Sequence, residues 1–333
     1  MKVLHLPSGS DISMLSQQLR TMGIDATSCS FSSSDIYSYR ADVRLNLNDY
    51  PPDEKKKKLE AYFKEAMNTY DVFHFHFGKT FNSKTDLALL KRNQKKLIVH
   101  HRGSEVRTFS IASRNNPYVY IKSKWPEETI QKYLKRLSNY IDNAIVPDYE
   151  LKSYIEPYYK KIHVVPRAIN SHEYTPKYPI AETNPIIVHA PSHTEVKGTN
   201  YVLAAVDRLE KEGLKFQFKL IENLPHKEAL KEYQKATIII DQLRIGSYAN
   251  LSMEAMAMGK PVICYIRDDL FNKFPGKLPI VNANPDTIYD VLKDLLNHPE
   301  RWEDLGKKGR NYVEEYHSVE KVARSLIDIY KTL

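Results

Sequence analysis

The stretch at residues 238–266 constrains the fold of this chain more than any other part, because its residue types change in a definite order. It opens with the β-branched run Ile-Ile-Ile and continues with small and polar residues. Residues 251–258 are mostly helix formers, and Gly259 followed by Pro261 is typical of a helix end before a second apolar run. The order predicts strand, loop, helix, turn and strand.

The start of the predicted helix is a candidate anion site. Backbone N–H groups without intrahelical partners and the positive end of the helix dipole favour negative charge there. Asn250 and Leu251 would present those N–H groups, and Glu254, one turn further on, would accept hydrogen bonds from neighbouring hydroxyls. This pairing suits a nucleoside diphosphate with its ribose. A glutamate at this position also serves simply to complement the helix dipole, so both interpretations stay open.

The run Leu-Ser-Met-Glu-Ala-Met-Ala-Met-Gly-Lys-Pro-Val-Ile, at residues 251–263, resembles a known signature. The signature is Glu-Ala-Met-Ala-x-Gly-x-Pro-Val, found in the family-4 retaining glycosyltransferases, which have the GT-B fold. That family carries two glutamates, spaced as Gly246 and Glu254 are, and the second one binds the ribose. Glu254 matches the second, whereas Gly246 replaces the first. We therefore expect contacts to the transferred sugar from Ser247, Tyr248 and Ala249 instead.

Length and composition indicate two domains in a soluble protein. A chain of 333 residues, 42% of them hydrophobic, is long enough to bury two cores. No apolar run approaches the roughly 20 residues of a membrane span, and the first apolar residues end at Pro7 before a signal-peptide core could form. Cys29 and Cys264 lie far apart, without the spacing of a metal or redox centre. We expect reduced cysteines and a cytoplasmic location.

The positive charge of the chain is concentrated in its first half. Residues 1–168 contain 27 Lys and Arg against 18 Asp and Glu, whereas residues 169–333 contain 22 against 23. The excess favours an anionic partner, such as a pyrophosphate-linked acceptor or the acidic headgroups of a membrane. A solubilising surface is the alternative.

The first residues have the order of a Rossmann-type opening. It consists of a strand, a loop with one glycine, a helix and a second strand, at residues 2–6, 7–11, 12–22 and 24–31. A lone glycine also serves any tight turn. In the resembled family this first loop faces the donor, so the resemblance implies that Gly9 and Ser10 contact the donor phosphate.

Two later runs predict strands that carry histidines and end in glycine, at residues 72–78 and 96–103. In a parallel sheet their ends would lie at one edge. The segment His-Arg-Gly-Ser-Glu-Val-Arg, residues 101–107, is similar to the His-Gly-Ser-Asp-Val-Arg of the resembled family, which lies at the acceptor side of the active site. This resemblance implies a catalytic role for His101 or Arg102, and the spacing does not decide between them.

Aromatic and basic residues alternate at residues 116–125. Such a segment can stack on nucleic-acid bases, line the entrance for a sugar or lipid, or pack in a core. No fold signature of a nucleic-acid-binding protein accompanies it, so we expect no nucleic-acid partner.

A second alternating unit begins at residue 186 with an apolar strand, followed by Lys197-Gly198 and a predicted helix. In the resembled family the lysine of such a pair binds the donor pyrophosphate together with an earlier arginine. Lys197 matches the lysine, whereas Ser192 or His193 stands near the place of the arginine. The resemblance also places Glu222 beside the nucleotide base.

Together these features predict an α/β protein of the GT-B fold, with two Rossmann-like domains facing across a cleft. We expect an acceptor-binding domain, a linker, a donor-binding domain and a C-terminal helix that returns to the first domain, at residues 1–168, 169–185, 186–316 and 317–333.

The resemblance implies a retaining glycosyltransferase that uses a nucleotide-sugar donor, with a UDP-sugar favoured. The acceptor would be an anionic or lipid-linked glycan, as in cell-surface polysaccharide or glycolipid synthesis, and the protein would contact the inner face of the membrane peripherally. We expect no cofactor and no metal, because Asp268-Asp269 has the position of turn residues. Two alternatives are a nucleotide-sugar epimerase of the same fold and a catalytically silent nucleotide-binding scaffold.

Overall fold

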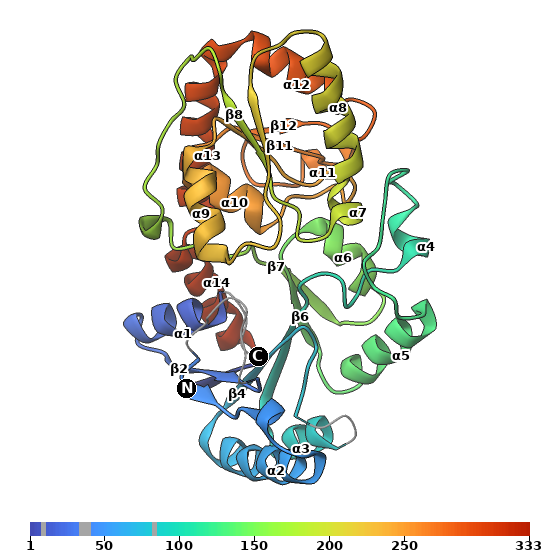
Figure 1. Ribbon diagram of the computed structural model, residues 1–333. Coiled ribbons are helices and arrows are strands. Elements are labelled where there is room, and N and C mark those ends of the chain that lie inside the picture. The colour runs from blue at the N-terminus through green and yellow to red at the C-terminus, as the bar shows by residue number, and fades with distance from the viewer. Residues whose placement is uncertain (8–10, 33–40, 82–84) are drawn as a thin grey trace. The chain divides into compact units, whose positions relative to one another are not determined.

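The computed structural model describes residues 1–7, 11–32, 41–81 and 85–333, and it divides into two compact units (Figure 1). The first unit comprises Met1–Thr108, Ser123–Ala168 and Val319–Leu333. The second comprises Phe109–Lys122 and Ile169–Ser318. The chain thus enters the second unit twice, first for a short segment and then from Ile169 to Ser318, and its last residues return to the first unit. Gly9 and Ser10 lie outside the described residues.

The first unit is built on a parallel sheet with the strand order β3-β2-β1-β4-β5-β6-β7. Its strands are β1 Lys2–Leu6, β2 Asp25–Ser30, β3 Val43–Arg44, β4 Val72–His76, β5 Lys96–His100, β6 Asn143–Val146 and β7 Lys161–Val164. Its helices are α1 Ile12–Thr21, α2 Pro52–Thr69, α3 Asp86–Arg92, α5 Glu127–Ser138, α6 Tyr149–Ile155 and α14 Val319–Thr332.

Helix α14 comes from the far end of the chain and packs against α1 in the first unit. Its apolar face, which includes Leu326 and Tyr330, joins a core with Val3, Leu15 and Ile98. Every residue of β4 is buried, which fits a strand covered on both faces of a parallel sheet. The prediction that the C-terminal helix returns to the first domain is therefore confirmed.

The second unit has a parallel sheet with the strand order β12-β11-β10-β8-β9. Its strands are β8 Ile186–His189, β9 Gln217–Leu220, β10 Ile238–Ile240, β11 Val262–Cys264 and β12 Ile280–Asn282. Its helices are α4 Phe109–Ala112, α7 Thr194–Lys197, α8 Thr199–Lys211, α9 His226–Lys235, α10 Asn250–Ala257, α11 Asp268–Phe271, α12 Ile288–Asn297 and α13 Trp302–Tyr316.

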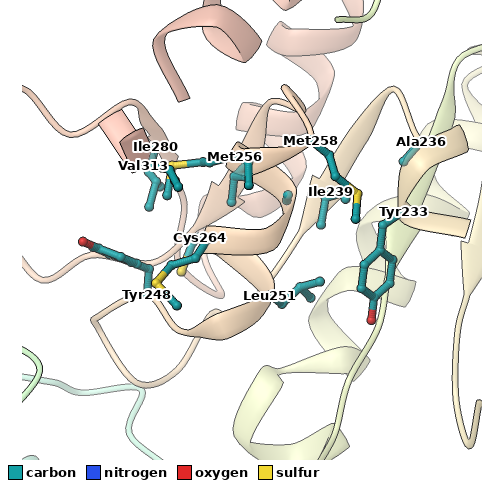
Figure 2. Packing of buried hydrophobic residues seen from close by; sticks show 14 of the residues in the cluster. Tyr233, Ala236, Ile239, Tyr248, Leu251, Met256, Met258, Cys264, Ile280 and Val313 are labelled. Atoms are coloured by element: carbon teal, nitrogen blue, oxygen red, sulfur yellow. The ribbon is translucent and has the colours of Figure 1, made fainter. Parts of the chain in front are cut away.

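The core of the second unit surrounds α10 (Figure 2). This helix is apolar on most of its surface, and it packs against α13 and the sheet through residues such as Met256. Figure 2 shows Met256 close to Ile280 and Val313, and Leu251 at the start of the same helix. Because α10 is held on several sides, its N-terminus has a fixed position in the unit.

The stretch at residues 238–266 folds as predicted, into β10, the following loop, α10, a turn and β11. The fold class is also confirmed, since both units are α/β with parallel sheets. Within the described residues, no helix combines the length and apolar character that a membrane span requires.

Candidate functional site

The loop between β10 and α10 turns on Gly246, whose φ is +85°. An L-residue rarely adopts this conformation, and a Cβ atom at Gly246 would collide with the side chain of Arg267. Arg267 is itself fixed, because its Nε and Nη2 each donate to a carboxylate oxygen of Asp269 at 2.8 Å. Glycine is thus required at this position for two reasons, the positive φ of the backbone and the close approach of the Arg267 side chain. Asp269, one of the two adjacent aspartates, is engaged in this ion pair.

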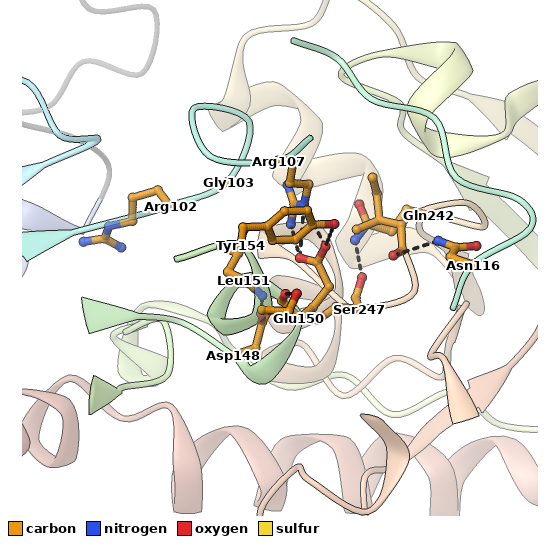
Figure 3. Close-up of polar contacts among 12 residues, drawn as sticks. Arg102, Gly103, Arg107, Asn116, Asp148, Glu150, Leu151, Tyr154, Gln242 and Ser247 are labelled. Atoms are coloured by element: carbon orange, nitrogen blue, oxygen red, sulfur yellow. Dashed lines mark hydrogen bonds and ion pairs between the residues drawn. The ribbon is translucent and has the colours of Figure 1, made fainter. Parts of the chain in front are cut away.

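Two side chains hold the same loop, one from another part of the second unit and one from the loop itself (Figure 3). Asn116 Nδ2 donates to the carbonyl oxygens of Arg244 at 2.8 Å and of Ile245 at 3.1 Å, and Gln242 Nε2 donates to the carbonyl of Ser247. Asn116 belongs to the short segment that the second unit takes from within the first half of the chain. Sequence reasoning missed Gln242, and it missed Asn116 because it considered that segment only for its aromatic and basic residues.

Helix α10 begins directly after this loop with backbone N–H groups suited to an anion. The N-cap residue, Ala249, has no side-chain acceptor, and the first intrahelical bond runs from the N–H of Met253 to the carbonyl of Ala249. The N–H groups of Asn250, Leu251 and Ser252 precede that bond. Such groups at the positive end of a helix attract phosphate oxygens.

Glu254, one turn into α10, is hydrogen-bonded to His226. Nε2 of His226 lies 2.8 Å from Oε1 of Glu254, and the Glu254 side chain is 13% exposed. The hydrogen bond to Glu254 raises the pKa of His226, against the opposing effect of burial. His226 begins α9, directly after Pro225 and beyond the end of β9. In the sequence, only this position after a predicted strand indicated that His226 could belong to the site.

Lys197 lies at the end of α7, just before α8, and its ammonium group is buried in an ion pair with Asp241. It also donates to Oε1 of Gln242 at 3.2 Å, and Ser252 Oγ donates to Asp241 at 2.6 Å. Burial opposes ionisation of Asp241, but the attraction of Lys197 and the hydrogen bonds outweigh it and hold the pKa of Asp241 below its usual value. Two of the three N–H donors of Lys197 thus have partners within the unit. Sequence reasoning missed Asp241.

The remaining predicted donor residues are in varied environments. Ser192 and Glu222 are exposed, and Glu222 follows the end of β9. His193 caps α7, with Nδ1 accepting from the N–H of Val196 at 3.5 Å. Tyr248 is buried in the core, and its hydroxyl lies 2.8 Å from Nε2 of His317, so only its backbone is available to a ligand in this conformation.

In the first unit, the two candidate catalytic residues differ in their hydrogen-bond partners and in the direction of their side chains. His101 is fully buried, and its Nε2 lies 2.9 Å from the hydroxyl of Tyr159. Arg102 donates from Nη1 to Asp11 at 2.5 Å, and its Nη2 lies 3.2 Å from Nδ1 of His76. The guanidinium of Arg102 therefore lies at the end of the sheet, beside Asp11, whereas the imidazole of His101 points into the unit. Of the two, Arg102 is the better placed to meet a ligand.

The last arginine of the same motif has a structural role (Figure 3). Arg107 donates from Nε and Nη2 to the carboxylate of Glu150, at 3.0 Å and 2.7 Å, and Tyr154 donates to the same carboxylate at 2.9 Å. Glu150 is only 1% exposed, so this ion pair joins the loop after β5 to helix α6.

We compared the chain with known proteins. Residues 192–328 match the model of a family described as glycosyl transferase-like. No curated protein matches the sequence. Among solved structures, sucrose-phosphate synthase from Thermosynechococcus elongatus matches with a TM-score of 0.68 at 15% identity, over 100% of this chain and 99% of the other.

Two further solved structures match over the full length of both chains. They are HepE from Anabaena, in complex with UDP-glucose, with a TM-score of 0.66 at 10% identity, and a UDP-GlcNAc 2-epimerase from Neisseria meningitidis, with a TM-score of 0.57 at 16% identity. At these identities the likeness concerns the fold alone. The chain has the GT-B fold, and residues 192–328 are similar to the glycosyl transferase-like family.

Proposed function

We propose that this chain is a glycosyltransferase that moves a sugar from a nucleoside diphosphate donor to an acceptor hydroxyl. The observation that carries the proposal is the start of α10, where the backbone N–H groups of the first turn and the partly buried carboxylate of Glu254 lie about one helical turn apart. An anion on the N–H groups and a ribose hydroxyl on Glu254 would occupy both parts of this site.

In the proposed reaction the second unit stabilises the departing nucleoside diphosphate. Negative charge develops on the pyrophosphate as the bond to the sugar breaks, and the amides of α10 would stabilise it. Lys197 would add its third N–H donor. Because Asp241 already balances its charge, we assign the larger share of this stabilisation to the helix amides. Transfer would then need no divalent metal on the pyrophosphate, as expected from the sequence.

We favour UDP as the nucleotide and retention of configuration at the transferred carbon. HepE, which shares the fold, was solved with UDP and with UDP-glucose, and the motif around Glu254 resembles that of retaining enzymes. The loop at Gly246 would meet the sugar through the backbone of Ser247, Tyr248 and Ala249. Arg102 would act in the first unit, on the acceptor side.

The acceptor is proposed to be an anionic or lipid-linked glycan, because the first half of the chain carries the excess of positive charge. Co-sedimentation with vesicles of acidic lipid tests this part separately. Binding that weakens with added salt supports an acceptor displayed on a membrane. Equal binding to neutral vesicles, or none to acidic ones, would contradict it.

A nucleotide-sugar epimerase is the second candidate, because the Neisseria enzyme, solved with UDP-GlcNAc, shares the fold over its whole length. An epimerase needs only one substrate, so conversion of a nucleotide sugar without an acceptor would identify it. A catalytically silent scaffold is the third candidate. It is favoured by the ion pair with Asp241, which already balances the charge of Lys197, and by Gly246, which replaces the first glutamate of the resembled signature.

Thermal unfolding with UDP, GDP and ADP tests the donor site directly. A ligand that binds only the folded protein raises the melting temperature according to its affinity and excess. We expect UDP and UDP-sugars to raise it, equally with and without EDTA. No rise with any nucleoside diphosphate would contradict the proposed donor site, and a rise abolished by EDTA would contradict its independence of metal.

A further inference from the structure

Four buried histidines lie on one face of the first sheet, below helix α14. The strand β4 alternates Phe and His, so His74 and His76 point to the same face. His5 pairs in register with His74, and His100 pairs with His76, which extends the row across β1, β4 and β5. All four side chains are at most 1% exposed.

Three of these histidines form a hydrogen-bonded chain with Tyr330 of α14 that runs from His74 to Arg102. The hydroxyl of Tyr330 lies 2.6 Å from Nδ1 of His74 and 3.3 Å from Nε2 of His5. Nδ1 of His5 lies 3.2 Å from Nε2 of His76, and Nδ1 of His76 lies 3.2 Å from Nη2 of Arg102. We call this series the histidine chain.

Arg102 fixes the direction of every hydrogen bond in the histidine chain, because a guanidinium can only donate. Nδ1 of His76 must therefore accept, which leaves the proton of neutral His76 on Nε2. His76 then donates to Nδ1 of His5, and His5 donates from Nε2 to the Tyr330 oxygen. Tyr330 in turn donates to Nδ1 of His74, whose Nε2 has no partner among the described residues.

The surroundings keep these imidazoles neutral, as the hydrogen-bond directions of the histidine chain require. Burial lowers the pKa of His5 to about 3, and burial also holds the pKa values of His74 and His76 well below the usual value. The positive charge of Arg102 adds to the effect on each of the three.

The same three histidines are close enough to be considered as metal ligands, since their ligand atoms lie within 4.8 Å of one another. Two observations oppose a metal. The rings of His74 and His76 are stacked, with centroids 4.3 Å apart and planes 15° apart, so their in-plane lone pairs do not converge on one point. In addition, the cationic Arg102 already bonds to His76.

We propose that Tyr330, His5 and His76 are positioning residues that orient the guanidinium of Arg102 for sugar transfer. Asp11 fixes Nη1 and the histidine chain fixes Nη2, whereas Nε has no partner among the described residues. Nε is buried, so the donors held in one direction for a ligand oxygen are the second N–H groups of Nη1 and Nη2. The proposal rests on the proposed function, and it makes the C-terminal helix part of the working site.

The first test is spectroscopic and independent of activity. In protein labelled with ¹⁵N-histidine, a long-range ¹H–¹⁵N spectrum distinguishes the two neutral tautomers and the charged form. We expect His5, His74 and His76 to be neutral with the proton on Nε2, and we expect Arg102→Ala to release His76 and His5 from this single tautomer. A proton on Nδ1 of His76, or ring signals that shift on adding Zn²⁺, would overturn the histidine chain.

The second test separates positioning from packing. His76→Leu removes the acceptor of Arg102, and Tyr330→Phe removes one hydroxyl. We expect each to lower kcat about 10- to 100-fold with little change in KM for the donor, as for a misplaced catalytic group. His76→Asn, whose Oδ1 can accept from Arg102 at the place of Nδ1, should recover most of the activity lost in His76→Leu.

His100→Leu is the matched control, because His100 is equally buried beside the same rings but has no hydrogen bond with a described residue. It should leave kcat within about 2-fold of the wild type. Equal losses in His100→Leu and His76→Leu would show that the histidines act by packing alone, which would overturn the positioning role. A wild type that shows the expected tautomers but transfers no sugar would contradict the proposed function and leave the histidine chain intact.

Discussion

Nε2 of His226 lies 2.8 Å from Oε1 of Glu254, so the carboxylate that we assign to the donor ribose already has a partner in the unliganded protein. His226 contacts Oε1, and a carboxylate has further lone pairs with which Glu254 can accept from a hydroxyl. His226 thus orients Glu254 near the start of α10, and the properties of this hydrogen-bonded pair can be measured.

Glu254→Gln should weaken UDP binding about 10- to 150-fold, which corresponds to the roughly 1.5 to 3 kcal/mol of a hydrogen bond to a charged group. Isothermal titration calorimetry measures this directly. Glu228→Gln is a suitable control, because Glu228 is exposed on α9 and pairs only with Lys231. Unchanged affinity in a folded Glu254→Gln protein would remove Glu254 from the donor site.

The ion pair of His226 and Glu254 should make stability depend on pH. Because the pKa of His226 is higher in the folded than in the unfolded protein, its stabilising effect is complete below the unfolded value of about 6.5 and is lost as the pH rises through the folded value. The difference in unfolding free energy between wild type and His226→Gln should therefore be larger at pH 6 than at pH 9. Urea titrations at the two pH values test this, and an equal difference at both would contradict it.

Lys197→Met should destabilise the protein by about 3–5 kcal/mol, because it leaves the buried carboxylate of Asp241 without its partner. Lys219→Met is the matched control, since Lys219 pairs with Glu232 at a more exposed position and should cost about 0–1 kcal/mol. Denaturant unfolding compares the two. A Lys197→Met protein of wild-type stability that no longer binds UDP would show that Lys197 serves the ligand and not the fold.

Gly246→Ala should destabilise the protein more than Gly213→Ala, although both glycines have a φ of +85°. A Cβ atom at Gly213 meets open space, so that variant measures backbone strain alone, about 1–2 kcal/mol. At Gly246 the collision with Arg267 should add about 1–3 kcal/mol.

Gly246→Glu should show the same backbone strain and the same collision with Arg267 as Gly246→Ala. It should lower the rate of sugar transfer more than it lowers the affinity for UDP. Activity gained by Gly246→Glu over an inactive wild type would instead favour the scaffold. Unfolding free energies and UDP release assays on these variants provide both comparisons.

These helices and strands were predictable from the sequence, because each depends on the order of residue types within a short stretch of the chain. The β-branched run, the helix formers and the Gly-x-Pro stop predicted β10, α10 and β11, and the structure confirms them. The two strands that carry histidines were likewise predicted to end at one edge, and β4 and β5 are parallel neighbours. The role of the C-terminal helix followed from the family resemblance, because nothing in its own residues indicates where it docks.

The contacts of the candidate site were not predictable, because they join residues far apart in the chain. Asp241 neutralises Lys197 across 44 positions, and Tyr330 reaches His5 across 325. Local patterns assign residues to helices and strands, but they do not show which side chains meet at the ends of a sheet. The choice between His101 and Arg102 was of this kind, and only the direction of each side chain separates them.

The most direct test of the central claim is the release of UDP from a panel of UDP-sugars, measured with and without an acceptor extract. We expect release that depends on the acceptor, persists in EDTA, is lost in Glu254→Gln and accompanies transfer of the sugar with its anomeric configuration retained. Conversion of a UDP-sugar to its epimer without an acceptor, or tight binding of UDP with no release from any donor, would contradict the assignment of this protein as a glycosyltransferase.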